Sequence, residues 1–278
     1  MPSLTPGSVR DLLAAHGCRP SRALGQHFLA DPNLARKIVR LADAADGDLV
    51  VEIGPGIGSL TVALAEAGTQ VVALELDRHL LPVLAEVLAG SSHPEAVEVV
   101  QGDGMTADFR ALTDGRRWVC VSNLPYNVAT PMVVRLLEEF PEMTRCLVMV
   151  QKEVGERLVA GPGTKAYGAV SVKVAYYALA RMVGTVAATV FVPPPNVASA
   201  LVLLDRRDTP PVDVPSPEAL FTLVRAGFGQ RRKTLRRALA GTLGERTESV
   251  LDAAGVDPSA RAETLTLDDW ARVCREAA

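Results

Sequence analysis

The chain has 278 residues, of which 48% are hydrophobic, and carries a formal net charge of −3 with a pI near 5.9. This length can bury an α/β core and still leave room for a small second domain. The acidic balance argues against a protein that binds polyanions over its whole surface, so contact with nucleic acid would require a local basic patch.

The cysteines and residues 1–11 indicate in which cellular compartment we expect the protein. Cys18, Cys120, Cys146 and Cys274 are too scattered for a metal site and too few for a disulfide framework, so we expect no metal and a reducing cytoplasm. Residues 1–11 lack the basic start and apolar run of a signal peptide, and no later stretch has the length needed to cross a bilayer. We expect a cytoplasmic monomer without membrane contact.

Short β-branched runs alternate with helical stretches from about residue 49 to residue 151. This alternation predicts a doubly wound, Rossmann-like α/β sheet. After a helix near 168–178, two further strands follow without a helix between them, which indicates a closing hairpin and an antiparallel last strand in a mostly parallel sheet. The predicted strands are 49–53, 70–75, 96–101, 118–122, 146–150, 183–191 and 199–204.

A proline-rich and charged segment, 205–217, interrupts this pattern and marks a domain boundary. We therefore predict an α/β domain over residues 1–208, in which residues 1–45 form a cap of helix and loop. Residues 209–278 are predicted to form a small all-helical domain.

The segment 50–58 is an apolar strand that runs into a glycine-rich turn and then into a helix starting near Ser59. The third glycine, Gly58, falls four residues after Gly54, whereas the dinucleotide fingerprint places it one residue later. This spacing favours S-adenosylmethionine over a nicotinamide cofactor. The alternative is a tight strand-to-helix turn without a ligand.

Polar residues follow the next three predicted strands. Glu75 ends the second strand, where a carboxylate can accept hydrogen bonds from both ribose hydroxyls of a nucleoside, and Asp103 follows the third, where it can accept from an adenine amine. Each acid alone could be a helix cap or a solvated loop residue. Their placement with Gly54 and Asn123 at the carboxyl ends of successive strands favours one ligand site.

The sequence Asn123-Leu124-Pro125-Tyr126 follows the fourth strand. The exocyclic nitrogen of adenine is a poor nucleophile, because its lone pair is delocalised into the ring. The Asn123 side-chain oxygen and the Leu124 carbonyl can accept both amine hydrogens and favour a pyramidal nitrogen, while Pro125 stiffens the turn and Tyr126 offers a stacking face. An ordinary turn with a buried tyrosine is the alternative.

With these residues in place, the chain resembles the ribosomal RNA adenine dimethyltransferase family, in particular its housekeeping small-subunit branch. The resemblance covers most of the chain. It rests on 25–29 (GQHFL), 52–58, 101–103 (QGD), 123–126 (NLPY) and 191–199 (FVPPPNVAS).

The resemblance implies dimethylation of N6 on two adjacent adenosines in the 3′-terminal hairpin loop of 16S rRNA, within a pre-ribosomal particle. Phe191 matches an aromatic residue that faces the target base opposite Tyr126. Two positions depart from the family pattern: His27 stands where asparagine is commoner, and Asn196 where lysine is usual. The residues implied in S-adenosylmethionine binding are Gln26, His27, Leu29, Gly54, Gly56, Glu75, Leu76, Asp103, Gly104 and Asn123.

A basic run near the C-terminal third predicts where RNA is held. Residues 225–237 contain six basic and no acidic side chains, and on a helix beginning near Gln230 the pairs at spacing four would share a face while Leu235 and Leu239 face the core. A solvated helix face is the alternative. The predicted RNA contacts are Arg225, Arg231, Arg232, Lys233, Arg236 and Arg237.

Two rival functions remain at this stage. One is a large-subunit rRNA adenine methyltransferase that confers antibiotic resistance, and the other is a ribosome-assembly factor that binds RNA with incidental methylation.

Overall fold

The structure, a computed structural model, describes residues 4–278. These residues form two compact units. Unit 1 holds the residues up to Gly155 together with Arg181–Arg206, and unit 2 holds Glu156–Ala180 and Arg207–Ala278. Among residues 4–278 no helix combines the length and apolarity of a membrane span, and no group of three His, Cys, Asp or Glu side chains could hold a metal.

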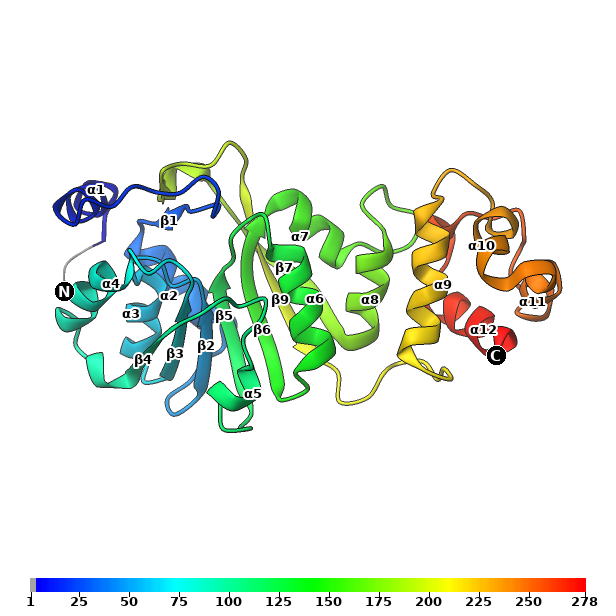
Figure 1. Cartoon of the computed structure of the whole chain (residues 1–278), viewed down its shortest axis with the longest axis horizontal. Coiled ribbons are helices and arrows are strands. Elements are labelled where there is room, and N and C mark those ends of the chain that lie inside the picture. Colours follow the sequence, from blue (N-terminus) through cyan, green and yellow to red (C-terminus); the bar gives the residue numbers. More distant parts are fainter. Residues whose placement is uncertain (1–3) are drawn as a thin grey trace. The chain divides into compact units, whose positions relative to one another are not determined.

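Unit 1 is built on a seven-stranded sheet in the order β4-β3-β2-β5-β6-β9-β7 (Figure 1). The strands β4, β3, β2, β5 and β6 are parallel to one another, and β9 is antiparallel to β6. This arrangement confirms the predicted class of sheet, which is mostly parallel with an antiparallel last strand. A two-stranded antiparallel sheet pairs β1 with β8. The bounds are β1 Phe28–Leu29, β2 Leu49–Ile53, β3 Gln70–Glu75, β4 Val97–Gln101, β5 Trp118–Asn123, β6 Met143–Gln151, β7 Ala178–Val186, β8 Phe191–Val192 and β9 Ser199–Arg206.

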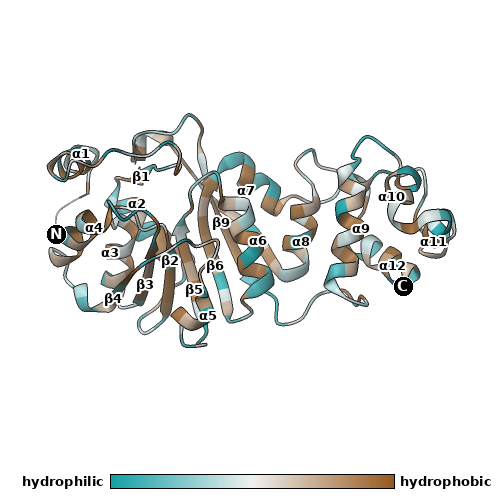
Figure 2. Ribbon diagram, in the orientation of Figure 1, coloured by the Kyte–Doolittle hydropathy of each residue, from teal (hydrophilic) through white to brown (hydrophobic). Residues whose placement is uncertain are grey.

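The central strands are apolar because helices cover the sheet. All five residues of β2 are buried, as expected for a parallel strand with both faces covered, and the central strands are mostly brown in Figure 2. Ile38 and Val39 of α2 pack with Leu60 of α3 against this core. The helices in this region are α1 Pro6–Ala15, α2 Pro32–Ala42, α3 Ser59–Glu66, α4 Leu81–Ala89, α5 Phe109–Leu112 and α6 Ala129–Glu139, with the 3₁₀ turns η1 Pro94–Ala96 and η2 Ala188–Val190. The next helix, α7 Lys152–Val159, starts in unit 1, and its residues from Glu156 on belong to unit 2.

The strand order reverses between β2 and β5. The chain goes from β2 outward to β3 and β4, then returns across the sheet to β5 and β6. In open α/β sheets such a switch point opens a crevice beyond the carboxyl ends of the strands, which is where ligands bind. The turns that follow β2 and β5 therefore flank a natural binding crevice.

Unit 2 is helical and has its own apolar core. Tyr176 of α8 packs edge-to-face on Phe221 of α9, with ring centroids 5.4 Å apart, and Trp270 of α12 is fully buried in the same cluster. The bounds are α8 Ala169–Tyr177, α9 Pro217–Gly229, α10 Leu235–Leu243, η3 Gly244–Arg246, α11 Thr247–Ala253, η4 Ala262–Thr264 and α12 Leu267–Ala277.

Several strands differ from the sequence expectation by one to three residues at an end, such as β6 at Met143–Gln151 against 146–150, and two boundaries differ by more. The strand expected over 183–191 is β7 at Ala178–Val186, followed by the η2 turn, and Phe191 belongs to the small sheet instead. The division of the chain near residue 208 also differs, because Glu156–Ala180 clusters with the C-terminal helices. The apolar face of α8, which includes Val172 and Tyr176, is buried by α9 rather than by the sheet.

Candidate active site

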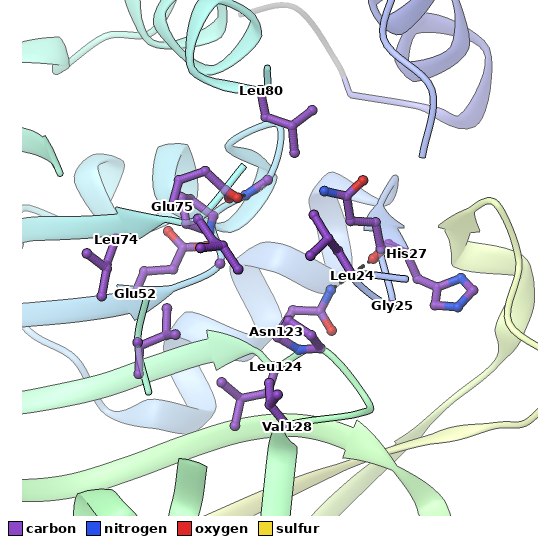
Figure 3. Close-up of a pocket in the computed structure, with 18 of the residues that line it drawn as sticks. Leu24, Gly25, His27, Glu52, Leu74, Glu75, Leu80, Asn123, Leu124 and Val128 are labelled. Atoms are coloured by element: carbon purple, nitrogen blue, oxygen red, sulfur yellow. Dashed lines mark hydrogen bonds between the residues drawn. The ribbon is translucent and has the colours of Figure 1, made fainter. Parts of the chain in front are cut away.

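One pocket in unit 1 gathers the turns at the carboxyl ends of β2, β3, β4 and β5 (Figure 3). About 1120 Å³ of empty space lies within its walls and at its mouth, a volume that includes open solvent. All but one of the residues predicted for cofactor and base line it: Gln26, His27, Leu29, Gly54, Gly56, Glu75, Leu76, Asp103, Gly104, Asn123, Leu124, Pro125 and Tyr126.

The glycine turn after β2 needs glycine for two reasons. Gly54, Gly56 and Gly58 all have positive φ, between 58° and 89°, a conformation that side chains disfavour. A Cβ on Gly56 would also lie 2.9 Å from the Phe28 ring, too close for any other residue. The turn thus brings bare backbone to the pocket wall.

Glu75 ends β3 and is 5% exposed. One carboxylate oxygen accepts a hydrogen bond from the Gly56 amide at 2.9 Å, and the other accepts from the Asp77 amide at 2.8 Å. Burial raises the pKa of this carboxyl, while the two amide hydrogen bonds oppose the rise. Both oxygens are therefore held in place at the pocket wall, and the neighbouring Leu76 side chain is 49% exposed beside them.

The N-terminal segment 24–29 forms another wall of the pocket. The Gln26 side chain accepts a hydrogen bond from the Ser21 amide at 2.7 Å and donates to Asp77 at 2.9 Å. The Leu29 side chain is buried and lines the pocket. Gln26 therefore ties this segment to the turn that follows Glu75.

Asn123, the last residue of β5, is fixed by the N-terminal segment. Its side-chain nitrogen donates to the His27 carbonyl oxygen at 3.0 Å, a bond drawn as a dashed line in Figure 3. This bond directs the amide nitrogen toward His27 and leaves Oδ1 as the atom that can accept from a ligand. The acceptor role of Asn123 stays a prediction, and this orientation is compatible with it.

Tyr126 is held on both its hydroxyl and its ring. The hydroxyl lies 2.6 Å from the Ser199 hydroxyl, and the ring stacks on the His27 imidazole with centroids 5.3 Å apart. The His27 Nδ1 atom lies 2.8 Å from the Pro193 carbonyl oxygen, so a Nδ1–H donates there. His27 thus covers one face of Tyr126 while its backbone positions Asn123.

Phe191 differs from the sequence expectation. It is paired with Leu29 across the small sheet, is 2% exposed, and belongs to the core of unit 1 rather than to the pocket lining. Its ring is enclosed by aliphatic side chains, so it offers no face to a base in this structure.

Glu52 is a pocket residue that was not among the predicted ligand contacts. It is 1% exposed within β2, and its Oε2 has no hydrogen-bond partner among residues 4–278. Burial, with a smaller contribution from the charge of Glu75, raises its pKa to about 8. The sequence signal was a single charged residue inside an otherwise apolar strand, a costly placement in a protein interior.

The basic run of unit 2 is only partly helical, which corrects the helix predicted from Gln230. The α9 helix ends at Gly229, residues 230–234 turn with the Lys233 amide donating to the Gln230 carbonyl, and α10 begins at Leu235 after its N-cap, Thr234. Arg232 and Lys233 therefore do not share a helix with Arg236 and Arg237. Leu235 and Leu239 are fully buried, as predicted.

Comparison with known proteins decides the family. The family described as ribosomal RNA adenine dimethylase matches residues 19–278. The chain belongs to this family. It is therefore an rRNA adenine dimethyltransferase, and the asparagine turn lines the pocket at the sheet edge.

Curated relatives agree with that assignment, and solved structures share the fold. The chain is 47% identical to ribosomal RNA small subunit methyltransferase A of Thermobifida fusca, over 97% of this chain and 94% of the relative, and 46% identical to the protein of the same name in Streptomyces coelicolor, over 97% and 95%. Among solved structures, the 23S rRNA methyltransferase ErmE has a TM-score of 0.69 at 27% identity and covers 90% of this chain and 98% of its own. A dimethyladenosine transferase from Plasmodium falciparum, at 24% identity, shares the fold with a TM-score of 0.71 over 89% and 96%.

The contact between Ser199 and Tyr126 in this dimethyltransferase gives a first prediction. Ser199 is fully buried, so removing either hydroxyl leaves the other without its partner. We expect Ser199→Ala and Tyr126→Phe each to lower the free energy of unfolding by about 1–2 kcal/mol, and the double variant to lose little more than either single one. Urea unfolding of all four proteins measures this coupling, and fully additive losses would contradict it.

Proposed function

We propose that this enzyme uses S-adenosylmethionine to dimethylate N6 of two adjacent adenosines in the 3′-terminal hairpin loop of 16S rRNA during ribosome biogenesis. The observation that carries the proposal is the fixed Asn123 amide, which presents Oδ1 to the pocket. The small-subunit choice is supported by near full-length relatives at 46–47% identity that are named small-subunit methyltransferases, against 27% for the large-subunit enzyme ErmE.

The pocket fits the proposed donor. The Glu75 carboxylate has lone pairs left for ribose hydroxyls beside its two amide hydrogen bonds. Asp103 uses Oδ1 to accept the Met105 amide, and within the described part of the chain its Oδ2 accepts nothing, so it is available to an adenine amine. The exposed Leu76 supplies apolar contact for the base. S-adenosylmethionine would supply an electrophilic methyl group, since its sulfonium can release a neutral thioether, S-adenosylhomocysteine, as the leaving group.

The catalytic contribution of the protein is then positioning. In the first transfer Asn123 Oδ1 and the Leu124 carbonyl accept the two hydrogens of the target amine, which turns its lone pair out of the ring plane, and the surplus proton of the methylated amine passes to water. In the second transfer the amine carries one hydrogen, which one of these two acceptors holds. Tyr126, held by Ser199, supports the flipped-out base by stacking. Fixing an amine and a methyl donor in this geometry removes much of the entropic barrier of a bimolecular reaction.

We further propose that unit 2 docks RNA through a subset of the basic run. Arg231 is committed to Glu263 at 2.9 Å and to the Lys165 carbonyl at 2.8 Å, and Arg236 lies 3.5 Å from Glu248. Arg225 donates to the Thr222 hydroxyl. Among residues 4–278, the exposed side chains of Arg232, Lys233 and Arg237 have no hydrogen-bond or ion-pair partner, which leaves them free for phosphates.

Replacing these three cations with glutamine tests the docking surface. We expect the triple variant to bind 16S rRNA fragments more weakly and to lower the slope of log affinity against log salt by about 2, because each phosphate contact contributes about 0.7–0.9 to that slope. Filter binding at several salt concentrations measures it. The single variants Arg231→Gln and Arg232→Gln remove the same charge, so the second should weaken binding more than the first; equal effects would count against the assignment.

The substrate choice is tested on isolated subunits. Unmethylated small and large subunits are incubated with a tritiated methyl donor, and the labelled nucleotides are located on the RNA. Two adjacent dimethyladenosines near the 3′ end of 16S rRNA are expected. Label only on the large subunit would favour the resistance methyltransferase, and tight subunit binding without turnover would favour an assembly factor.

A further inference from the structure

Arg135, on α6, has all three of its side-chain nitrogens engaged. Nη1 donates to the Gly104 carbonyl oxygen at 2.6 Å, Nη2 donates to the Ala107 carbonyl oxygen at 2.8 Å, and Nε pairs with Glu139 at 3.0 Å. The guanidinium carbon also lies 5.0 Å from the centre of the Phe140 ring and 5.7 Å from that of Phe109. The side chain is only 13% exposed, so the guanidinium is held in one place.

The two carbonyls that Arg135 holds belong to the loop that follows β4. This loop carries Asp103, whose Oδ1 accepts the Met105 amide and whose Oδ2 is free for a ligand. A second residue of α6, Met132, packs directly against the same loop. The space beside Gly104 is so narrow that an added Cβ would lie 2.7 Å from Met132 Cε. Met132 and Arg135 are three residues apart and thus share a helix face.

Hydrogen bonds within the loop close a turn around the Asp103 carbonyl, which accepts from the Thr106 and Ala107 amides, but they leave the Gly104 and Ala107 carbonyls to Arg135. Gly102 and Gly104 flank Asp103, and the Asp103 and Thr106 side chains are exposed. A flexible loop loses entropy when it orders around a ligand, and this loss lowers affinity, whereas a loop ordered beforehand avoids it. A planar guanidinium can bridge two carbonyls and lie against aromatic rings at once, which a lysine ammonium cannot do.

We propose that Arg135 is a positioning residue for adenine recognition: by holding the Gly104 and Ala107 carbonyls it fixes Asp103 toward the amine of the cofactor's adenine. The inference rests on the proposed use of S-adenosylmethionine. Arg135 touches neither donor nor RNA in this account and acts only through the loop. The helix that carries Arg135 begins at Ala129, just beyond the asparagine turn.

The test compares two ligands that differ at the adenine amine. S-adenosylhomocysteine carries the amine, and S-inosylhomocysteine carries a carbonyl in its place, so Asp103 should favour the first. We expect Arg135→Gln and Arg135→Lys to weaken binding of S-adenosylhomocysteine about tenfold and binding of S-inosylhomocysteine by less than about twofold. The ratio of the two affinities, which measures recognition of the adenine amine, should therefore fall. In steady-state assays the KM for the donor should rise while kcat stays within about twofold.

Calorimetric titration measures the affinity for each of the two ligands, and two reference variants calibrate it. Asp103→Ala marks complete loss of discrimination. Arg116→Gln is the matched control, because Arg116 also donates to a backbone carbonyl, that of Thr113, in a turn outside the pocket lining; it should change neither affinity. The lysine variant keeps the charge, so it remains informative should the glutamine variant fold poorly.

The outcomes separate the two proposals. Equal weakening of both ligands by the Arg135 variants would mean a merely structural role, and unchanged affinities would mean no role; either overturns the inference while the proposed function stands. Failure of the unmodified protein to bind S-adenosylhomocysteine would overturn both.

Discussion

Replacing Asn123 with alanine is expected to reduce the rate of methyl transfer about 10²–10³-fold at saturating donor, in line with the loss of one preorganised polar group in other active sites. The variant lacks the Oδ1 acceptor for the target amine. It also lacks the hydrogen bond to the His27 carbonyl that orients the N-terminal segment. Single-turnover methylation of small subunits measures the effect.

The control for this prediction is another asparagine of the same turn. Asn127 also lines the pocket, and its side-chain nitrogen donates to the carbonyl of Ala23, just before the N-terminal segment, at 3.4 Å. Asn127→Ala therefore loses a comparable contact but no acceptor for the amine, and it should stay within about tenfold of the unmodified enzyme. Similar losses in both variants would assign the effect to the segment rather than to amine recognition.

The strand tips of this site were predictable from sequence for a physical reason. A parallel strand buried on both faces needs a continuous apolar run, and the runs in β2 and β3 end in Gly54 and in Glu75. Because parallel strands end at the same edge, the residues that close each run meet there. The expected strands 49–53 and 70–75 consequently match the observed bounds of β2 and β3.

The parts that sequence did not predict depend on tertiary contacts. Phe191 is equally suited to a base-stacking position and to a core, and only its pairing with Leu29 in the small sheet buries it. The start of α10 was misplaced because the spacing of Leu235 and Leu239 defines a helix face but not its first residue. Threonine is a residue type favoured at helix N-caps, so Thr234 was the sequence signal for a helix that begins at Leu235.

The protonation state of Glu52 could not be predicted from the sequence, because it depends on the burial of this carboxyl in the folded protein. In the ordinary environment its pKa is 4.5, and burial raises it to about 8 in the folded protein. Between these two values the folded state holds a proton that the unfolded state has released. Stability must then fall as pH rises from about 4.5 to about 8, by at most about 5 kcal/mol from this group, and level off above the folded pKa.

Replacing Glu52 with glutamine is expected to remove that pH dependence, because the amide keeps the shape of the protonated carboxyl and cannot ionise. The unfolding free energy of Glu52→Gln relative to the unmodified protein should therefore rise by several kcal/mol between pH 5 and pH 8 without cofactor. Urea unfolding at four pH values in this range measures the difference. Glu98→Gln on exposed β4 is the matched control and should parallel the unmodified protein; a Glu52→Gln curve that also runs parallel would mean that Glu52 is ionised in the folded state.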